Sequence, residues 1–365
     1  MEQDKKIRVG ITHGDINSIA YEVIIKALED DRLLELCDVI VYGSSRMARE
    51  HGNMMELPEV KFNAIESASD CQPERYNIIN VVDDDTELNI GQSTEKAGQA
   101  AFAALERAVA DLREGDIDVL VTAPINKHNI HSSSFTFPGH TEYLESSLGN
   151  PGDALMIMVS DRLKVALVTI HLPIEEVAQH VTRELVENSI LRLEESLKAD
   201  FGIHKPRIAV LSLDPHVGDN GVIGKADAEI VAPAIAEAKA KKVLCFGPYS
   251  ADGFFGSGAY TKFDGVLAMY HDQGLTPFKL IAGEEGINFT AGLPYVRTSP
   301  DHGTAYDIAG KGEADPASMR NAIYKAIDIF RNRRSHAEAT ANPLRKQNFD
   351  RGSDKVPREA KKSNQ

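Results

Sequence analysis

Phe263-Asp264-Gly265-Val266-Leu267-Ala268-Met269-Tyr270-His271-Asp272-Gln273-Gly274 is the stretch that indicates the fold. Its short apolar run, bounded by turn-forming residues, is typical of a buried parallel strand. The run ends in an imidazole, a carboxylate, an amide and a flexible glycine. We therefore expect a strand that leads into a polar loop carrying functional groups.

Two other apolar runs end in the same way. Residues 165–170 stop at His171, and residues 208–213 stop just before Pro215-His216. Ligands collect beyond the carboxyl ends of strands in open α/β sheets, so His171, His216 and His271 are expected to converge. Three imidazoles with an open position form the protein part of a divalent-metal site. Taken singly, each one can also be a loop histidine that hydrogen-bonds to nearby backbone.

Short apolar runs alternate with helical patterns along most of the chain. The expected strands cover residues 7–11, 39–43 and 118–122, and the expected helices cover residues 21–34, 94–112, 174–199 and 319–331. The alternation of strands and helices predicts an α/β protein with parallel strands. A polar segment from residue 336 onward is predicted to be disordered.

Composition narrows the class of partner. The 365 residues carry a formal net charge of −15, which argues against a nucleic-acid partner, because phosphate backbones require a basic surface. No long apolar run and no apolar N-terminal segment occur, so neither a membrane span nor a signal peptide is expected and the predicted location is the cytoplasm. The 3 cysteines are scattered and show no disulfide framework. The expected partner is a small molecule. Any anionic group on it would be bound by local cations such as Lys127, Lys279 and Arg297.

No G-x-G-x-x-G dinucleotide fingerprint is present. Several longer motifs nevertheless resemble one family, the 4-hydroxythreonine-4-phosphate dehydrogenases of pyridoxal phosphate biosynthesis. These motifs are Thr122-Ala123-Pro124-Ile125-Asn126-Lys127, Gly139-His140-Thr141-Glu142, Thr169-Ile170-His171-Leu172-Pro173, Pro215-His216, Ala268-Met269-Tyr270-His271-Asp272-Gln273-Gly274 and Gly292-Leu293-Pro294-Tyr295-Val296-Arg297-Thr298-Ser299.

The resemblance implies a fold like that of isocitrate and isopropylmalate dehydrogenases, with two α/β/α domains and a central cleft. The first domain would comprise residues 1–130 and 285–335, with a nucleotide loop at 302–316. The second domain, residues 131–284, would carry the metal ligands and the dimer contacts, and residues 336–365 would form the tail. The resemblance also implies a homodimer with shared active sites, to which one subunit supplies His171 and His216 and its partner supplies His271.

Site residues carried over from the family fall into four groups. The implied metal ligands, for Zn, Mg, Mn or Co, are His171, His216 and His271. The implied substrate contacts are His140, Thr141, Lys279, Asn288 and Arg297. The implied contacts of NAD or NADP are His302, Gly303, Thr304, Ala305, Asp307 and Asp315. Lys279, Asp252 and Asp272 are assigned to catalysis, although Lys279 can equally be a permanent cation on phosphate or carboxylate, and both aspartates can be turn residues.

The implied reaction is the NAD-dependent and metal-dependent oxidation of 4-phosphohydroxy-L-threonine, followed by decarboxylation to 3-amino-2-oxopropyl phosphate. Two alternatives remain open: a related dehydrogenase acting on another phosphorylated hydroxy acid, such as a phosphothreonate, or on a cyclic diol, and an inactive ligand-binding paralogue. One loop departs from the family. Where the family shows Gly-Asp-Pro-x-Gly-Ile-Gly-Pro-Glu, this chain has Gly14-Asp15-Ile16-Asn17-Ser18-Ile19-Ala20-Tyr21-Glu22. The added Cβ atoms would hinder a ligand that approached that backbone closely.

Overall fold

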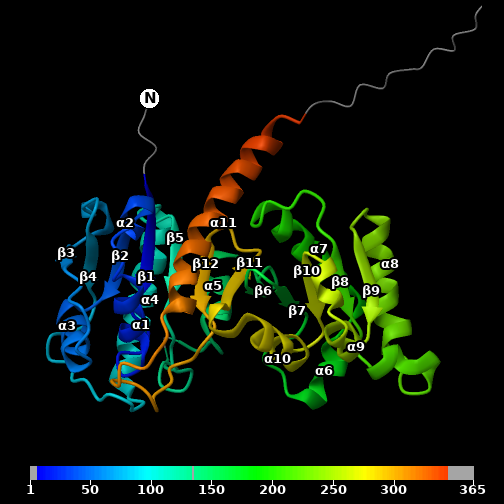
Figure 1. Cartoon of the computed structure of the whole chain (residues 1–365), viewed down its shortest axis with the longest axis horizontal. Helices are drawn as coiled ribbons and strands as arrows, with labels where there is room; N and C mark the ends of the chain where they lie inside the picture. Colours follow the sequence, from blue (N-terminus) through cyan, green and yellow to red (C-terminus); the bar gives the residue numbers. More distant parts are fainter. Residues whose placement is uncertain (1–5, 134, 344–365) are drawn as a thin grey trace, which may run out of the picture.

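The computed structural model describes residues 6–133 and 135–343. The strands of this part of the chain form one sheet in the order β3-β4-β2-β1-β5-β12-β11-β6-β7-β10-β8-β9 (Figure 1). They are β1 (Ile7–Thr12), β2 (Cys37–Gly43), β3 (Phe62–Ala64), β4 (Tyr76–Asn80), β5 (Val119–Thr122), β6 (Leu155–Val159), β7 (Lys164–Leu167), β8 (Ile208–Leu211), β9 (Cys245–Tyr249), β10 (Gly265–Ala268), β11 (Ile287–Ala291) and β12 (Val296–Pro300).

The helices pack on this sheet. They are α1 (Ala20–Ala27), α2 (Leu33–Leu36), α3 (Ser45–Met54), α4 (Glu95–Glu114), α5 (His140–Leu148), α6 (Ile174–His180), α7 (Arg183–Ala199), α8 (Ala232–Ala240), α9 (Ala251–Gly256), α10 (His271–Ala282) and α11 (Ala317–Ala341). Short helical turns are η1 (Ala68–Asp70), η2 (Pro215–Gly221), η3 (Asp227–Val231), η4 (Ala259–Lys262) and η5 (Gly283–Glu285). None of these helices has the length and apolar character needed to cross a membrane.

Most neighbouring strands are parallel, which confirms the α/β prediction. The exceptions lie in the middle, where β6 is antiparallel to both β7 and β11, and β11 is antiparallel to β12. The pairing of β11 with β6 therefore joins the strands of residues 7–122 to those of residues 164–268. We call this junction between the two groups of strands the seam. The predicted domain boundaries at 131 and 285 stay a prediction.

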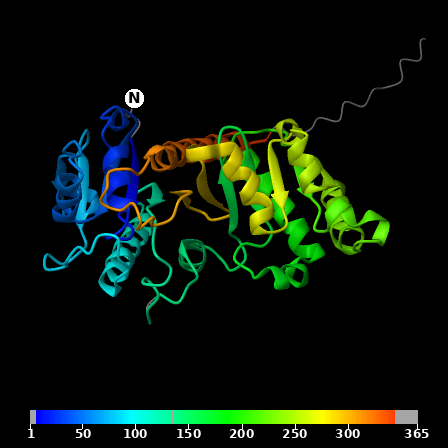
Figure 2. The same cartoon turned by 60° about the horizontal axis from the view of Figure 1, so that its bottom comes forward.

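Helix α11 lies across the seam of the elongated molecule (Figures 1 and 2). Its buried residues Met319, Ile323 and Ile327 recur at the helical spacing of four, and the helix packs on β12 and β5. The same apolar cluster includes Val121 of β5 and Leu267 of β10, so one core extends beneath both groups of strands. This continuous packing fixes the position of the strand ends that form the site.

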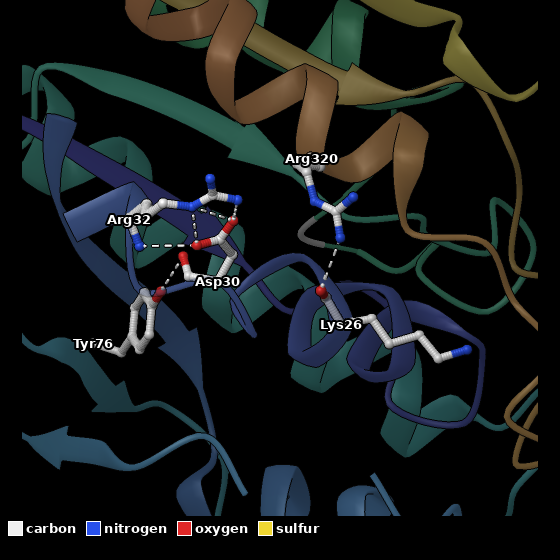
Figure 3. A network of polar contacts seen from close by, with 5 residues as sticks. All are labelled: Lys26, Asp30, Arg32, Tyr76 and Arg320. Atoms are coloured by element: carbon white, nitrogen blue, oxygen red, sulfur yellow. Dashed lines mark hydrogen bonds and ion pairs between the residues drawn. The ribbon is translucent and has the colours of Figure 1, made fainter. Parts of the chain in front are cut away.

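Figure 3 shows a polar contact between α11 and α1, together with contacts that stabilise the turn between α1 and α2. The guanidinium of Arg320 donates to the carbonyl of Lys26 at 3.3 Å, and the hydroxyl of Tyr76 donates to the carbonyl of Asp30, also at 3.3 Å. The Asp30 carboxylate accepts from the backbone N–H of Arg32 at 3.1 Å. This local turn interrupts the helix predicted over 21–34, which is instead divided into α1 and α2.

The other long helix prediction also needs correction. Residues 174–199 form α6 and α7 rather than one helix, because Thr182 adopts an extended backbone and its hydroxyl accepts from the N–H of Leu185 as the N-cap of α7.

The predicted start of the C-terminal tail at residue 336 is wrong, since α11 continues to Ala341. Alternate alanines favour helix there, and Arg334 pairs with Glu338 one turn away. The remainder of the predicted tail, residues 344–365, lies outside the described residues.

A stack of buried rings lies between α1, α3 and the loop after β1. Tyr21 lies between His13 and His51, with ring centroids 5.4 and 5.0 Å away. Each histidine has its Nε2 on a carbonyl, of Ala100 and of Ile16 respectively, so Nε2 carries the proton. Both Nδ1 atoms are buried without a partner. A second proton would have no acceptor, and burial lowers the pKa of His13 to about 4.

This stack predicts a loss of stability in mild acid. Above about pH 6.5 His13 is neutral in both the folded and the unfolded chain. Between pH 6.5 and 4 only the unfolded chain takes up the proton, so the free energy of unfolding should fall by about 3 kcal/mol from this residue. Urea unfolding of the wild-type chain and His13→Gln at pH 7 and pH 4.5 measures the effect, with the exposed His204→Gln as control. A His13→Gln chain as acid-sensitive as the wild type would contradict the assignment.

Candidate active site

A cavity of about 280 Å³ lies where β5 and α5 meet β7, β10 and α10. Its walls come from strand ends on both sides of the seam. They are Thr122, Ala123, Pro124, Ile125, Lys127, Gly139, His140, Thr141, Glu142, Met156, Met158, His171, His271, Leu275, Lys279, Asn288, Arg297, Ser299, Pro300, Asp301, His302 and Gly303. All five predicted substrate contacts are thus brought together, along with two of the three predicted metal ligands.

A larger cavity, about 860 Å³, lies near β3 and β4 and is lined by residues such as Glu29, Glu59 and Arg75. It contains none of the motif residues. We take the smaller cavity as the candidate site because its walls carry convergent imidazole, ammonium and guanidinium groups.

Arg297 lies on β12 at the floor of this cavity with only 2% of its surface exposed. Its Nε and one terminal nitrogen donate to the hydroxyl of Thr122 at 3.0 and 2.6 Å, and the other terminal nitrogen donates to Thr290 at 3.1 Å. No carboxylate of the described residues lies within 4.0 Å of this guanidinium. Burial lowers the pKa of Arg297 to about 10, so it remains charged at neutral pH. A buried cation paired only with hydroxyls is poised to receive an anion.

Several other wall groups are buried without a partner. They are Nε2 of His140, Oε2 of Glu142, Oδ1 of Asn288 and Nε2 of His302. Burial, with Arg297 and Lys127 nearby, lowers the pKa of His140 well below its ordinary value, so this imidazole is neutral. Buried polar atoms are nearly always hydrogen-bonded in native proteins. Their concentration around one cavity indicates a polar ligand there.

His171 and His271 face each other across one side of the cavity, with ring centroids 6.2 Å apart. Nε2 of His171 accepts from the Lys127 ammonium at 3.1 Å, while its Nδ1 lies 3.6 Å from Oε1 of Glu142. Nδ1 of His271 lies 3.3 Å from Asp272. Two imidazoles backed by carboxylates are a donor set that suits Zn²⁺ or Co²⁺.

His216 is not part of this wall. It lies in η2, a run of left-handed backbone from His216 (φ 53°) to Asn220 (φ 55°), and is exposed. Within one chain the histidines that meet are therefore His171 and His271, and the three ligands do not gather. The described residues contain another acidic group with metal-like spacing, Asp111, Glu114 and Asp116. Its most buried member, Asp111, already accepts from Tyr42 at 2.8 Å and pairs with Arg107.

The predicted catalytic residues are separated by the structure. Lys279 lines the cavity, and its ammonium lies 3.3 Å from the carboxylate of Asp301. Burial raises the pKa of Asp301, although Lys279 opposes the shift. Asp272 has a side chain 83% exposed, and Asp252 accepts from the hydroxyl of Ser250. Neither lines the cavity, and their assignment to catalysis stays a prediction.

Only the start of the predicted nucleotide loop reaches the cavity, through His302 and Gly303. The carbonyl of Thr304 accepts from Ile19 at 3.2 Å, Ala305 has φ 41°, Asp307 is exposed, and Asp315 accepts from the N–H of Ala317 at the start of α11. These four residues therefore do not line the cavity, and their assignment to cofactor binding stays a prediction.

Residues 14–22, the loop that departs from the family, pack against the predicted nucleotide loop. Asp15 accepts from the hydroxyl of Tyr306 at 2.7 Å, and Asn17 accepts from the N–H of Asn89 at 2.8 Å. Asn17 and Ser18 are both fully buried, and no residue from 14 to 22 lines the cavity. The side chains that replace glycine are thus packed against the loop and do not obstruct the candidate site.

Glu142 and Asp301 were not predicted as site residues from the sequence. Glu142 stands two residues after His140 in the first turn of α5, and Asp301 directly follows β12. The carboxylate within the His-Thr-Glu motif was an available signal for Glu142. One placement also needs correction, since His271 begins α10 rather than lying in a loop. Asn288 and Arg297 lie on the two antiparallel strands β11 and β12. The antiparallel pair β11–β12 was missed because its residues alternate in a short polar segment.

Comparison with known proteins places these motifs in a family. Residues 35–326 match the model of the family described as pyridoxal phosphate biosynthetic protein PdxA. A 4-hydroxythreonine-4-phosphate dehydrogenase of Bacteroides thetaiotaomicron is 53% identical over 352 residues, which cover 96% of this chain and 96% of that protein. A D-threonate 4-phosphate dehydrogenase of Cupriavidus necator is 38% identical, covering 88% of this chain and 96% of its own length.

Solved structures of two dehydrogenases have a fold similar to that of this chain. The crystal structure of a 4-hydroxythreonine-4-phosphate dehydrogenase from Klebsiella pneumoniae superposes with a TM-score of 0.77 at 35% identity, and the match covers 89% of this chain and 100% of that one. A terephthalate 1,2-cis-dihydrodiol dehydrogenase from Burkholderia xenovorans shares the fold at 23% identity and a TM-score of 0.59, over 89% of this chain and 98% of that one.

Proposed function

The chain belongs to the pyridoxal phosphate biosynthetic protein PdxA family, and from this premise we propose that it is a 4-hydroxythreonine-4-phosphate dehydrogenase. The observation that carries the proposal is Arg297, a buried guanidinium at the cavity floor that has no carboxylate of the described residues within 4.0 Å. The substrate, 4-phosphohydroxy-L-threonine, supplies the missing anions in its phosphate and its carboxylate.

The remaining wall groups suit the rest of that substrate. Lys279 and Lys127 add two cations to the cavity, and Asn288 and His140 add neutral hydrogen-bonding atoms that are now without partners. A neutral His140 can donate one hydrogen bond and accept another, which a phosphate ester and a hydroxyl together satisfy. We assign Arg297, Lys279, Asn288, His140 and Thr141 to substrate binding.

A nicotinamide cofactor, NAD or NADP, would take the hydride from the substrate carbinol carbon when bound. His302 and Gly303 lie where the proposed nucleotide loop reaches the cavity. On the other side of that loop, Asp15 accepts a hydrogen bond from Tyr306, and Asn17 accepts one from the adjacent Asn89. The chain's own task is to orient the carbinol toward the cofactor and to exclude water from the cavity.

A divalent metal would be held by His171 and His271, with His216 as a third ligand, and would supply Lewis acidity for the alcohol oxidation and for the loss of CO₂. Lys279 is the group of this chain placed to accept or return a proton in the cavity, with Asp301 as its partner at 3.3 Å. The carboxylate carbon leaves as CO₂, and the product is 3-amino-2-oxopropyl phosphate.

We propose further that two chains form a homodimer with shared sites. Large apolar side chains follow each of the three histidines and are exposed: Ile174 by 73%, Val222 by 82% and Leu280 by 83%. A second copy would cover them. Because His171 and His271 meet within one chain and His216 does not, we assign His216 to the site of the partner subunit.

A second candidate is oxidation of D-threonate 4-phosphate, since a relative with that name is 38% identical. The 53% identity to the Bacteroides protein favours the aminated substrate. The test is NADH formation from 4-phosphohydroxy-L-threonine with CO₂ release measured in parallel, before and after treatment with a chelator. Equimolar NADH and CO₂ that chelation abolishes and added Zn²⁺ or Co²⁺ restores would support the proposal. Bound substrate without turnover would identify an inactive binding protein instead.

A further inference from the structure

Two side chains contact His171, those of Lys127 and Glu142, and neither is among the proposed metal ligands. The ammonium of Lys127 has hydrogen atoms to donate and no lone pair. Since it lies 3.1 Å from Nε2 of His171, Nε2 must be the unprotonated nitrogen and Nδ1 must carry the hydrogen. Glu142 lies on that Nδ1 side at 3.6 Å.

The two neighbours therefore act on opposite nitrogens of one ring. An Nδ1–H that faces a carboxylate keeps the ring oriented with Nε2 toward the cavity and makes Nε2 a better donor to a metal. The Lys127 ammonium occupies the lone pair of the same Nε2. A metal ion would need that lone pair at about 2.0–2.1 Å, so it cannot share it with the ammonium.

The other contacts of Glu142 and Lys127 are consistent with these opposite effects on His171. The second carboxylate oxygen of Glu142, Oε2, is buried without a hydrogen-bond partner, and within the described residues the ion pair of Glu142 is the one with His171. Lys127 forms no ion pair with any carboxylate of the described residues within 4.0 Å, and its side chain is exposed, so it can swing away when an ion arrives.

We propose that Glu142 and Lys127 are opposed positioning residues: Glu142 presents Nε2 of His171 to the metal, and Lys127 occupies that nitrogen until the metal displaces it. The proposal rests on the proposed metal site. It predicts opposite effects of two substitutions a few ångströms apart, which a general structural role would not produce.

The test is Co²⁺ binding to the metal-free full-length chain, measured by calorimetry and by the visible absorption of bound Co²⁺ without substrate. Glu142→Gln should weaken Co²⁺ binding by roughly 10-fold to 100-fold. Lys127→Met should strengthen it by roughly 3-fold to 10-fold, because the competing cation is gone. Neither change needs to disturb the core, since the Glu142 side chain is 30% exposed and Lys127 is exposed. Thermal unfolding of the metal-free variants verifies this.

A matched control separates contact from net charge. Lys279→Met removes one positive charge from the same cavity without touching His171. It should change Co²⁺ affinity by less than about 2-fold, because the Lys279 side chain is 54% exposed and exposed charges are screened by solvent.

The outcomes distinguish this inference from the proposed function. If His171→Ala abolishes Co²⁺ binding while Glu142→Gln has no effect, or Lys127→Met matches Lys279→Met, the positioning roles are overturned and the metal site stands. If His171→Ala leaves Co²⁺ affinity unchanged, both the positioning roles and the proposed metal site fall.

Discussion

Arg297→Met is expected to abolish substrate binding and at the same time to raise the stability of the ligand-free chain. The loss of a charge-assisted, bidentate contact with phosphate or carboxylate should cost about 3–4 kcal/mol, or roughly 100-fold to 1,000-fold in kcat/KM. The gain in stability has a separate cause. The guanidinium is 2% exposed, and its hydrogen-bond partners among the described residues are the hydroxyls of Thr122 and Thr290, so the folded chain bears the cost of burying a charge without an ion-pair partner. An apolar side chain of similar length removes this cost and should add about 1–3 kcal/mol to the free energy of unfolding.

Arg297→Lys is the matched control. It keeps the buried charge but loses the planar fork, so it should lose most substrate affinity without the gain in stability. Steady-state kinetics and urea unfolding of the same preparations give both quantities. Unchanged kcat/KM in Arg297→Met would remove Arg297 from the substrate site. A destabilised Arg297→Met that has also lost binding would refute only the claim that the charge is uncompensated.

Mixed dimers of inactive variants are expected to regain activity in a pattern that identifies the shared ligand. His171→Ala, His216→Ala and His271→Ala should each be almost inactive alone. When His216→Ala is mixed with either other variant, one site of each hybrid collects intact His171 and His271 from one chain and intact His216 from its partner. Random mixing makes half of the dimers hybrid with one good site of two, so about a quarter of wild-type activity should return.

The third pair gives the opposite result. Mixing His171→Ala with His271→Ala should restore nothing, because those side chains belong to the same site in one chain, with ring centroids 6.2 Å apart. Rescue by this pair, with none from His171→Ala and His216→Ala, would instead support the arrangement that the family resemblance implied, in which His271 crosses. No rescue in verified hybrids of any pair would mean that all three ligands come from one subunit or that they do not form one site.

The parts of the site that could be predicted from the sequence are those attached to strand ends. His171 and His271 end apolar runs that became β7 and β10, and parallel neighbours place their carboxyl ends at the same edge. His216 follows β8, which also neighbours β10, yet the left-handed turn after Pro215 carries its side chain away from the cavity. Gly218, Asp219 and Asn220 are residue types that tolerate positive φ, but Val217 is a poor candidate for it, so the residue types alone do not predict the full left-handed run.

The parts that the sequence did not predict depend on contacts between distant segments. The hairpin of β11 and β12 is short and polar, yet its position between β5 and β6 joins the two groups of strands and buries Arg297. The contact of Glu142 with His171 spans the seam between those groups, so no local pattern records it. The altered loop at Asn17 and Ser18 was expected to affect ligand binding, but tertiary packing places it behind the predicted nucleotide loop and outside the cavity wall.

The most direct test of the central claim is the ratio of kcat/KM for 4-phosphohydroxy-L-threonine to that for D-threonate 4-phosphate, measured by NADH formation with one metal-loaded preparation. The proposed function predicts a ratio in favour of the aminated substrate of at least about 10, equivalent to 1.4 kcal/mol of transition-state binding. A ratio below 1 would assign the chain to the threonate phosphate, and NADH formation from neither compound would contradict the proposed function.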